Sequence, residues 1–388
     1  MATSLDASTS ANPSRKSSKS IKSSSRSSTS TPPLGKFLAS SEKHVRDKAV
    51  ASLSRFLSAG RINKSAVGNK DDGEAAQGDN EVEELPLGEL HWDEKWEADS
   101  RLAPAEMAKL WKGIFFCFWM SDKPLVQQAL AQDLADLTLD VRPKSKTRNG
   151  RVERFRAALC YLRGFWESVT REWAGLDRLR LDKFYLLIRR FAHVAFRLLE
   201  REGWDEWAIA EYSAVLTGPG GPLNVQDPKL PHSLPYHVAD VYLTEIERLS
   251  SSKLSDSVEV SPSPPRNLPL NLLLGPFYTA IAACPTSTMF TRFADEIYTP
   301  LLDAFLPPPP QPPHKRRKTA AKSKRLEYPG ILAVATEGSD AAEADAAGEL
   351  IGKSVLKRLF AEGGKAETED PNRRRIYAFV GAREQDLE

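Results

Sequence analysis

The strongest apolar periodicity of the chain lies in residues 110–196. At its start, apolar residues repeat at helical spacing and also fill the other faces of the helix; they are Leu110, Trp111, Ile114, Phe115, Phe116, Phe118 and Trp119. A helix that is apolar nearly all round is a buried one. Pro124 fits the first turn of the next helix, and Ser121 or Asp122 is placed to cap it.

Two long helices are predicted next. The first keeps spacings of three and four through Val152, Phe155, Leu159, Leu162, Trp166, Val169 and Trp173. This pattern predicts a helix that buries Trp166 and ends at Gly175. Asp177 is placed to cap the second helix. The apolar stripe of that helix comprises Leu181, Phe184, Tyr185, Ile188, Ala192, Ala195 and Leu199.

Shorter periodic segments flank this centre, in the ranges 33–57, 206–216, 236–249, 268–283, 287–305 and 350–360. In the first of them, the spacing of Val45, Ala49 and Leu53 resembles the inner helix of a HEAT repeat. Sequential helices with short connections become neighbours in space. We therefore predict an all-α fold, a HEAT-like stack of antiparallel helix pairs with disordered, low-complexity ends.

Composition divides the chain into four parts. Residues 1–32 form a basic, serine-rich tail that has too few apolar residues to offset chain entropy and is expected to be disordered. Residues 33–305 form the helical core, interrupted by an acidic linker at 61–89. A linker at 306–346, Pro-rich, then basic, then acidic, leads to a C-terminal docking segment, 347–388. Within that segment, residues 373–380 are predicted to be a strand or an extended segment that docks on the core or on a partner.

Composition and motifs argue against several functions. Cys117, Cys160 and Cys284 lie far apart in apolar segments, which predicts buried free thiols in a reducing compartment. No histidine has a cysteine or carboxylate at metal-ligand spacing, and neither a phosphate-binding glycine loop nor a nucleophile motif occurs. We expect no enzyme, no cofactor, no metal, no small-molecule substrate, no secretory signal and no membrane span.

The net charge of +2 hides a strong segregation of charge. Residues 71–106 carry thirteen acids against two bases, whereas residues 142–156 carry seven bases against one acid. The basic stretch is predicted to be mostly a mobile loop without core residues, because it contains Pro143, Asn149 and Gly150. The candidate RNA-binding residues of this surface are Arg142, Lys144, Lys146, Arg148 and Arg151, continued by Lys183 and Arg190 on the long helix that follows.

Two interpretations of these bases stay open. Long cations in a mobile loop on a rigid helical frame suit phosphate binding, where they replace condensed counterions. A solvated loop, and the solvated side of an amphipathic helix, explain the same residues. The Asp182–Lys183 pair is explained by a cap or a salt bridge within the helix more simply than by catalysis.

A second basic cluster follows a polyproline stretch at 307–313. It consists of Lys315, Arg316, Arg317, Lys318, Lys322, Lys324 and Arg325, with no acid among them. Short Lys/Arg runs on an exposed tether are typical of nuclear localisation signals or nucleic-acid patches. This cluster predicts a nuclear protein.

Two aromatic-rich blocks resemble a known family. LWKGIFFCFWMSDKP at 110–124 and FWESVTREWAGLDRLRLDKFYLLIRR at 165–190 are similar to the signature blocks of the ribosomal RNA processing protein 1 family, and two weaker blocks at 37–57 and 234–249 fit as well. The resemblance covers roughly residues 34–303 and is specific, since long blocks in the right order are hard to match by chance. It implies an all-helical, repeat-like fold, no catalysis, and a nucleolar role in maturing the precursor of the large-subunit RNAs.

We therefore expect a non-enzymatic helical scaffold that supports processing of the ribosomal RNA precursor and assembly of the large ribosomal subunit. Its expected partners are the precursor large-subunit particle, other ribosome assembly proteins and the ribosomal RNA precursor. With the resemblance, RNA contact by the basic loop is favoured over a merely solvated loop. The alternative is a nuclear helical-repeat adaptor that binds proteins only.

Overall fold

The computed structural model describes residues 34–59, 99–144, 149–256, 268–306, 328–335 and 341–385. Within these ranges every regular element is a helix and no strand occurs. The predicted all-α class is confirmed. The tail 1–32, the acidic linker 61–89 and the basic cluster 315–325 lie outside the described residues.

The first half of the helical unit corresponds to the aromatic-rich centre of the sequence and the segment before it. Its elements are α1 (Leu34–Leu38), α2 (Lys43–Ala59), α4 (Pro104–Trp119), α5 (Pro124–Asp140), α6 (Arg151–Glu172), the 3₁₀ turn η2 (Trp173–Gly175) and α7 (Arg178–Arg201). The second half comprises α8 (Glu206–Thr217), α9 (Ser233–Asp256), α10 (Leu270–Leu273), α11 (Gly275–Ala282), α12 (Ser287–Phe293), the π-helical turn η3 (Ala294–Tyr298), α13 (Thr299–Phe305), α14 (Pro329–Ala335), α15 (Ala341–Gly363) and α16 (Asp370–Gln385).

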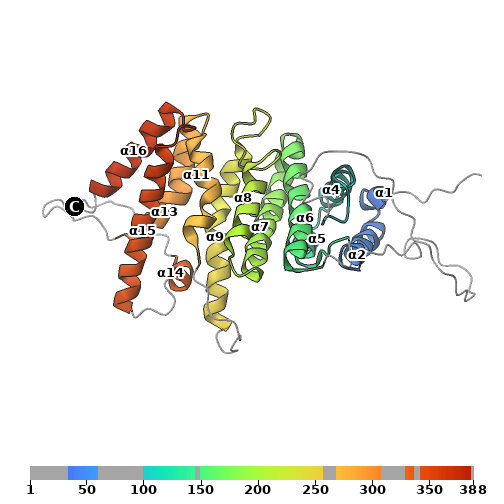
Figure 1. Ribbon diagram of the computed structural model, residues 1–388. Helices are drawn as coiled ribbons and strands as arrows, with labels where there is room; N and C mark the ends of the chain where they lie inside the picture. Colours follow the sequence, from blue (N-terminus) through green and yellow to red (C-terminus); the bar gives the residue numbers. More distant parts are fainter. Residues whose placement is uncertain are drawn as a thin grey trace, which may run out of the picture. The chain divides into compact units, whose positions relative to one another are not determined.

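The helices of this unit pack in two layers, in chain order (Figure 1). In one layer α2 packs on α5, α5 on α7, and α7 on α9. In the other layer α1 packs on α4, α4 on α6, α6 on α8, and α8 on α10 and α11. The connection 120–123 between α4 and α5 is too short for anything but a reversal, so these two helices run antiparallel. Each helix from α4 to α8 therefore packs on the helices two before and two after it in the chain.

A cluster of aromatic rings around Trp111 joins α4 to α6 and α7. Trp111 Nε1 donates a hydrogen bond to the backbone oxygen of Tyr161, 3.0 Å away, and the Trp111 ring contacts the rings of Tyr161, Phe165 and Phe191. Phe165 and Phe191 stack with their centroids 3.8 Å apart. The approach of Trp111 to α6 requires Gly164, since a Cβ there would lie 2.6 Å from Trp111 Nε1.

The local signals at the helix ends are mostly confirmed. The Asp177 side chain accepts a hydrogen bond of 3.0 Å from the backbone N–H of Arg180, as expected of an N-cap, and Pro124 stands in the first turn of α5. The predicted cap of α5 by Ser121 or Asp122 is wrong. The N-cap is Lys123, without a side-chain hydrogen bond, because the Ser121 hydroxyl instead donates to the backbone oxygen of Cys117. Trp166 is buried, as its spacing predicted.

The thiols of Cys117, Cys160 and Cys284 are buried and form no disulfide, as predicted. Burial raises the pKa of the Cys117 thiol to about 11 and that of Cys284 to about 12. The thiolate is the reactive form of cysteine, so these side chains are inert fillers of the core at neutral pH.

The C-terminal part of the chain returns to the helical unit. The prediction of a strand or extended segment at 373–380 is wrong, because these residues belong to helix α16, which packs on α15 and α11. Asn372 fixes this contact by donating hydrogen bonds to the backbone oxygens of Ala282 and Cys284 at the end of α11. In the same way the Glu247 carboxylate on α9 accepts hydrogen bonds from the backbone N–H groups of Gly330 and Ile331 in α14.

Replacing Gly164 with alanine tests the contact between α4 and α6. The added Cβ would collide with the buried Trp111 ring and lie 2.8 Å from Cγ of Met107, so the two helices must move apart. We expect the free energy of unfolding to fall by about 2 kcal/mol or more, measured by urea denaturation. The matched control is Gly175→Ala, where a Cβ meets no atom within 4 Å. Equal stability of both variants would show that Trp111 does not set the helix separation.

Candidate nucleic-acid interface

The described part of the predicted basic loop lies against the end of α2. The backbone N–H of Arg142 donates a hydrogen bond of 3.0 Å to the backbone oxygen of Leu57, and Nε of Arg101 donates one of 3.1 Å to the same oxygen. A helix C-terminus carries unpaired carbonyls and partial negative charge, which attracts cations. The expectation of a loop without core residues is wrong, since Val141 and Pro143 are buried.

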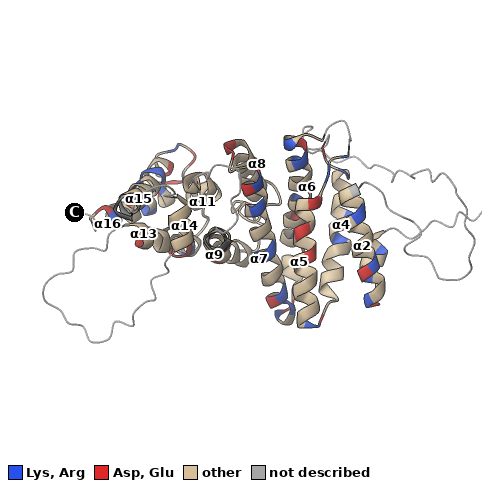
Figure 2. Ribbon diagram, turned by 90° about the horizontal axis from the view of Figure 1, so that it is seen from below, with Lys and Arg blue, Asp and Glu red and all other residues tan. Residues whose placement is uncertain are grey.

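Lys144 lies near the first turns of α4. An acid at this place is Glu106, whose carboxyl pKa is raised by burial, while the charges of Lys109 and Lys144 act in the opposite direction. Both ammonium groups are therefore close to this carboxyl. Arg101, Lys109, Arg142 and Lys144 together form a surface that we call the basic corner. It is built where α2 and α5 end and α4 begins, and Figure 2 marks the Lys and Arg segments along α2 and α4.

The charges of the basic corner are largely uncompensated. Among the described residues, no carboxylate lies in ion-pair contact with Arg142, Lys144 or Lys109. Lys146 and Arg148 fall outside the described residues. Lys109 was missed by the sequence analysis, because a lysine on a mostly apolar helix carries no signal of its own. It becomes part of the surface only when the loop folds back on α4.

Arg151 occupies a different position from the one predicted. Its guanidinium donates to the Glu202 carboxylate over 2.8 Å, to the Glu202 backbone oxygen, and to Asp205 over 2.6 Å. It thereby ties the start of α6 to the tight turn between α7 and α8, where Gly203 and Trp204 both have positive φ. Arg151 is about half exposed but already neutralised by two acids, so its main contribution is structural.

Lys183 is the clearest departure from the predicted basic surface. Its side chain is 5% exposed, and its ammonium donates hydrogen bonds to the backbone oxygens of Trp119, 2.6 Å away, and Ser121, 2.8 Å away. Burial lowers the pKa of this ammonium, and the charge of Asp122 acts in the opposite direction. Lys183 therefore caps the C-terminus of α4 from the neighbouring helix α7 and is not available to phosphate.

Arg190 does not extend the basic corner either. It is partly buried, and its Nε makes no hydrogen bond within the described residues. The other basic residue on this face, Arg197, pairs with Asp136 of α5 over 2.7 Å. The heptad spacing of Lys183, Arg190 and Arg197 does place them on one side of α7, but that side packs against other elements of the stack.

The nuclear-type cluster, Lys315, Arg316, Arg317, Lys318, Lys322, Lys324 and Arg325, lies outside the described residues. Its flanks are described: Leu306 before it and Tyr328 after it are both buried in the same core. The prediction placed this cluster on a tether beyond the helical core. The helical unit therefore includes described helices on both sides of this cluster, α13 before it and α14 after it.

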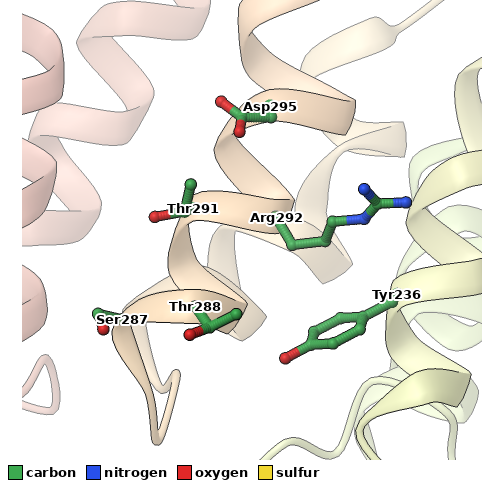
Figure 3. A pocket seen from close by; sticks show the side chains of 6 residues that line it. All are labelled: Tyr236, Ser287, Thr288, Thr291, Arg292 and Asp295. Atoms are coloured by element: carbon green, nitrogen blue, oxygen red, sulfur yellow. The ribbon is translucent and has the colours of Figure 1, made fainter.

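A metal site, a membrane-spanning helix and a phosphate-binding pocket find little support in the described ranges. There, no group of His, Cys, Asp or Glu side chains could hold a metal ion, and no helix is long and apolar enough to cross a membrane. An open pocket of about 320 Å³ lies between α9 and α12 (Figure 3). Its one basic side chain, Arg292, already pairs with Asp240 and Glu296, so the pocket offers no free positive charge.

Fold and surface together define an all-α protein of stacked helix pairs with a basic corner at one end of the stack. The chain belongs to the nucleolar protein Nop52 family, whose sequence pattern matches residues 29–379. This match confirms the family resemblance. The chain is similar to human "Ribosomal RNA processing protein 1 homolog A", with 25% identity over 368 residues, which cover 89% of this chain and 68% of that protein.

Further relatives match a smaller part. Human "Ribosomal RNA processing protein 1 homolog B" is 30% identical over 217 residues, which cover 56% of this chain and 22% of that protein. The Drosophila melanogaster "Ribosomal RNA processing protein 1 homolog" is 28% identical over 179 residues, covering 46% of this chain and 22% of that protein. The chain thus spans about a fifth of the length of these two relatives.

The role of Lys183 as a cap can be tested by Lys183→Met. This change keeps the apolar stem but leaves two backbone oxygens at the end of α4 without their donor. We expect the free energy of unfolding to fall by about 1–3 kcal/mol, measured by urea denaturation. The control is Lys112→Met at an exposed position of α4, expected to stay within about 0.5 kcal/mol. If the Lys183→Met protein has unchanged stability but binds RNA more weakly, Lys183 is an RNA-binding residue and not a helix cap.

Proposed function

We propose that this protein is a non-enzymatic ribosome biogenesis factor, which supports processing of the ribosomal RNA precursor and assembly of the large ribosomal subunit. The family match over residues 29–379 carries the proposal, because it spans the helical unit from α1 into α16. The relatives' names refer to ribosomal RNA processing, and we take this process for the present chain. In this role the helical unit is a scaffold for the precursor particle, its RNA and other assembly proteins.

The RNA contact in this proposal is made by the basic corner, together with Lys146 and Arg148. Arg142, Lys144 and Lys109 form no ion pair in the described ranges, and Glu106 is the one carboxylate shown to act on the two lysines, so their charge is available to phosphates. Such contacts position a protein on RNA without reading its sequence. The scaffold therefore recognises the shape and charge of a precursor, and sequence recognition belongs to base pairing or to partners.

A second candidate function is an adaptor that binds only proteins. It is favoured by the many inter-helix ion pairs, in which Arg151, Arg156 and Arg197 hold neighbouring helices together with acids of the same chain. Of the candidate RNA-binding bases that the structure describes, Arg151 and Lys183 thus have structural partners within the chain. RNA binding by the basic corner distinguishes the two functions.

Salt-dependent RNA binding tests the basic corner. We expect the double change Arg142→Gln and Lys144→Gln to weaken binding of an unstructured, mixed-sequence RNA and to flatten the slope of log affinity against log salt by roughly 1.4, because each lost phosphate contact to a single strand contributes about 0.7. The measurement is fluorescence anisotropy over a salt series. The matched control is Lys357→Gln with Arg374→Gln, which removes two exposed charges elsewhere. If both double variants have the wild-type salt slope, the function as an adaptor that binds only proteins is favoured.

We propose a nucleolar location with the cluster 315–325 as the nuclear signal. Alanine at Lys315, Arg316, Arg317 and Lys318 is expected to shift a fluorescently tagged protein from the nucleolus toward the cytoplasm, since nuclear import receptors recognise such basic runs. Imaging of living cells measures the ratio of nucleolar to cytoplasmic fluorescence. The control places alanine at four bases of the N-terminal tail, Lys16, Lys19, Lys22 and Arg26. If nucleolar fluorescence survives the first change and is lost with the second, the nuclear targeting signal lies in the N-terminal tail.

A further inference from the structure

Three large aliphatic side chains are exposed where α4 ends and where α5 and α7 begin. They are Met120, Leu125 and Leu179, which are 43%, 78% and 92% exposed. Only three other large apolar side chains in the described residues are comparably exposed, and they lie on α10 and α15. Single exposed apolar residues are ordinary, but a group drawn from three helices at one corner marks an interaction surface. We call this group the aliphatic corner.

Two contacts bring the starts of α5 and α7 to the end of α4. Lys183 of α7 donates to the backbone oxygens of Trp119 and Ser121, and the Arg180 guanidinium lies 4.8 Å from the centre of the Trp119 ring. Leu179 is one helical turn before Lys183 and therefore lies on the same side of α7. Met120 and Leu125 flank the connection that Lys183 holds.

The aliphatic corner is held rigidly in place. Besides the buried Lys183, the Ser121 hydroxyl bonds to the Cys117 backbone oxygen and the Gln127 amide donates to the Ser121 backbone oxygen over 2.8 Å. Pro124 fixes the first turn of α5. None of these contacts buries Met120, Leu125 or Leu179. A preformed surface loses little entropy when a partner binds, so it favours docking of a protein segment.

The charge around the aliphatic corner is positive. Residues 112–125 and 176–183 hold five bases against three acids. Lys112, Lys123 and Arg178 are exposed and pair with no carboxylate of the described residues. Arg180 and Asp177 bind each other, and the buried Lys183 lies 3.8 Å from Asp122, so Asp182 is the exposed acid that remains against these three bases. The free charge at the rim is therefore mainly basic, and it complements an acidic partner.

Aliphatic side chains distinguish a protein partner from RNA. Bases of single-stranded RNA stack on aromatic rings, whereas Met120, Leu125 and Leu179 have no ring. The aromatic ring at this place, Trp119, is already covered by Arg180 and packs against Phe115 and Phe184. We propose that the aliphatic corner is a docking site for a helical protein segment that carries aliphatic anchors among acidic residues. The inference deepens the scaffold role and rests on that proposed function.

Peptide binding to the full chain tests the docking site. The probes are three labelled helical peptides of equal length: one with leucines at i, i+3, i+4 and i+7 among glutamates, one with the same leucines among lysines, and one with the leucines replaced by serine. We expect only the leucine–glutamate peptide to bind, by fluorescence anisotropy. Leu125→Ser with Leu179→Ser should weaken it at least tenfold, whereas Leu350→Ser, an exposed leucine on α15, should leave it unchanged.

Charge reversal separates the two components of the site. Lys112→Glu, Lys123→Glu and Arg178→Glu together should abolish the preference for the acidic peptide over the basic one, without a change in thermal stability, because these side chains are exposed. The proposal is overturned if the leucine–glutamate peptide fails to bind, or binds the leucine variants as well as the wild type. It is also overturned if the leucine variants instead lose RNA binding, vesicle binding or self-association. These peptides contain no ribosomal component, so the docking site and the ribosomal function can fail separately.

Discussion

The close packing of α4 on α6 depends on Gly164, which has no side chain. Gly164 leaves space for the Trp111 indole, which then reaches the backbone of Tyr161 and the stacked pair Phe165–Phe191. Aromatic rings in such arrangements contribute both buried area and specific geometry. Because each helix from α4 to α8 touches the helices two before and two after it in the chain, the separation set here affects the positions of its neighbours in the stack. The surfaces at the end of α4 are positioned by the same contact.

Positive charge has two different roles in this chain. Arg151, Arg156 and Lys183 tie one helix to another, and each satisfies acids or carbonyls of the same molecule. Arg142 and Lys144 lie at helix ends, where no acid of the described residues forms an ion pair with them. Clusters of bases in the sequence do not distinguish these roles, since the difference depends on which partner the fold brings within reach. The proposed RNA contact uses the second group alone.

Most of the fold was predictable because the helices depend on residue patterns that are local in the sequence. The spacing that buries Trp166, the cap at Asp177 and the start of α6 depend on neighbours within a few residues along the chain. The errors come from contacts between distant segments. Lys183 looked like a surface base, but its long side chain reaches the end of α4. Helix α16 looked extended because its own periodicity is weak, and Asn372 holds it to α11. Of the candidate RNA residues, the fold leaves Arg142 and Lys144 free and pairs Arg151.

The central claim is that this helical unit is a scaffold on the precursor of the large ribosomal subunit. Sedimentation of the tagged protein from cell extract, followed by crosslinking to RNA and mapping of the crosslinked residues, tests it most directly. The account predicts that the protein sediments with large-subunit precursors and that its RNA crosslinks fall on the basic corner, at Lys109, Arg142 or Lys144. Sedimentation as free protein, or with precursors but with crosslinks only to other proteins, would contradict it.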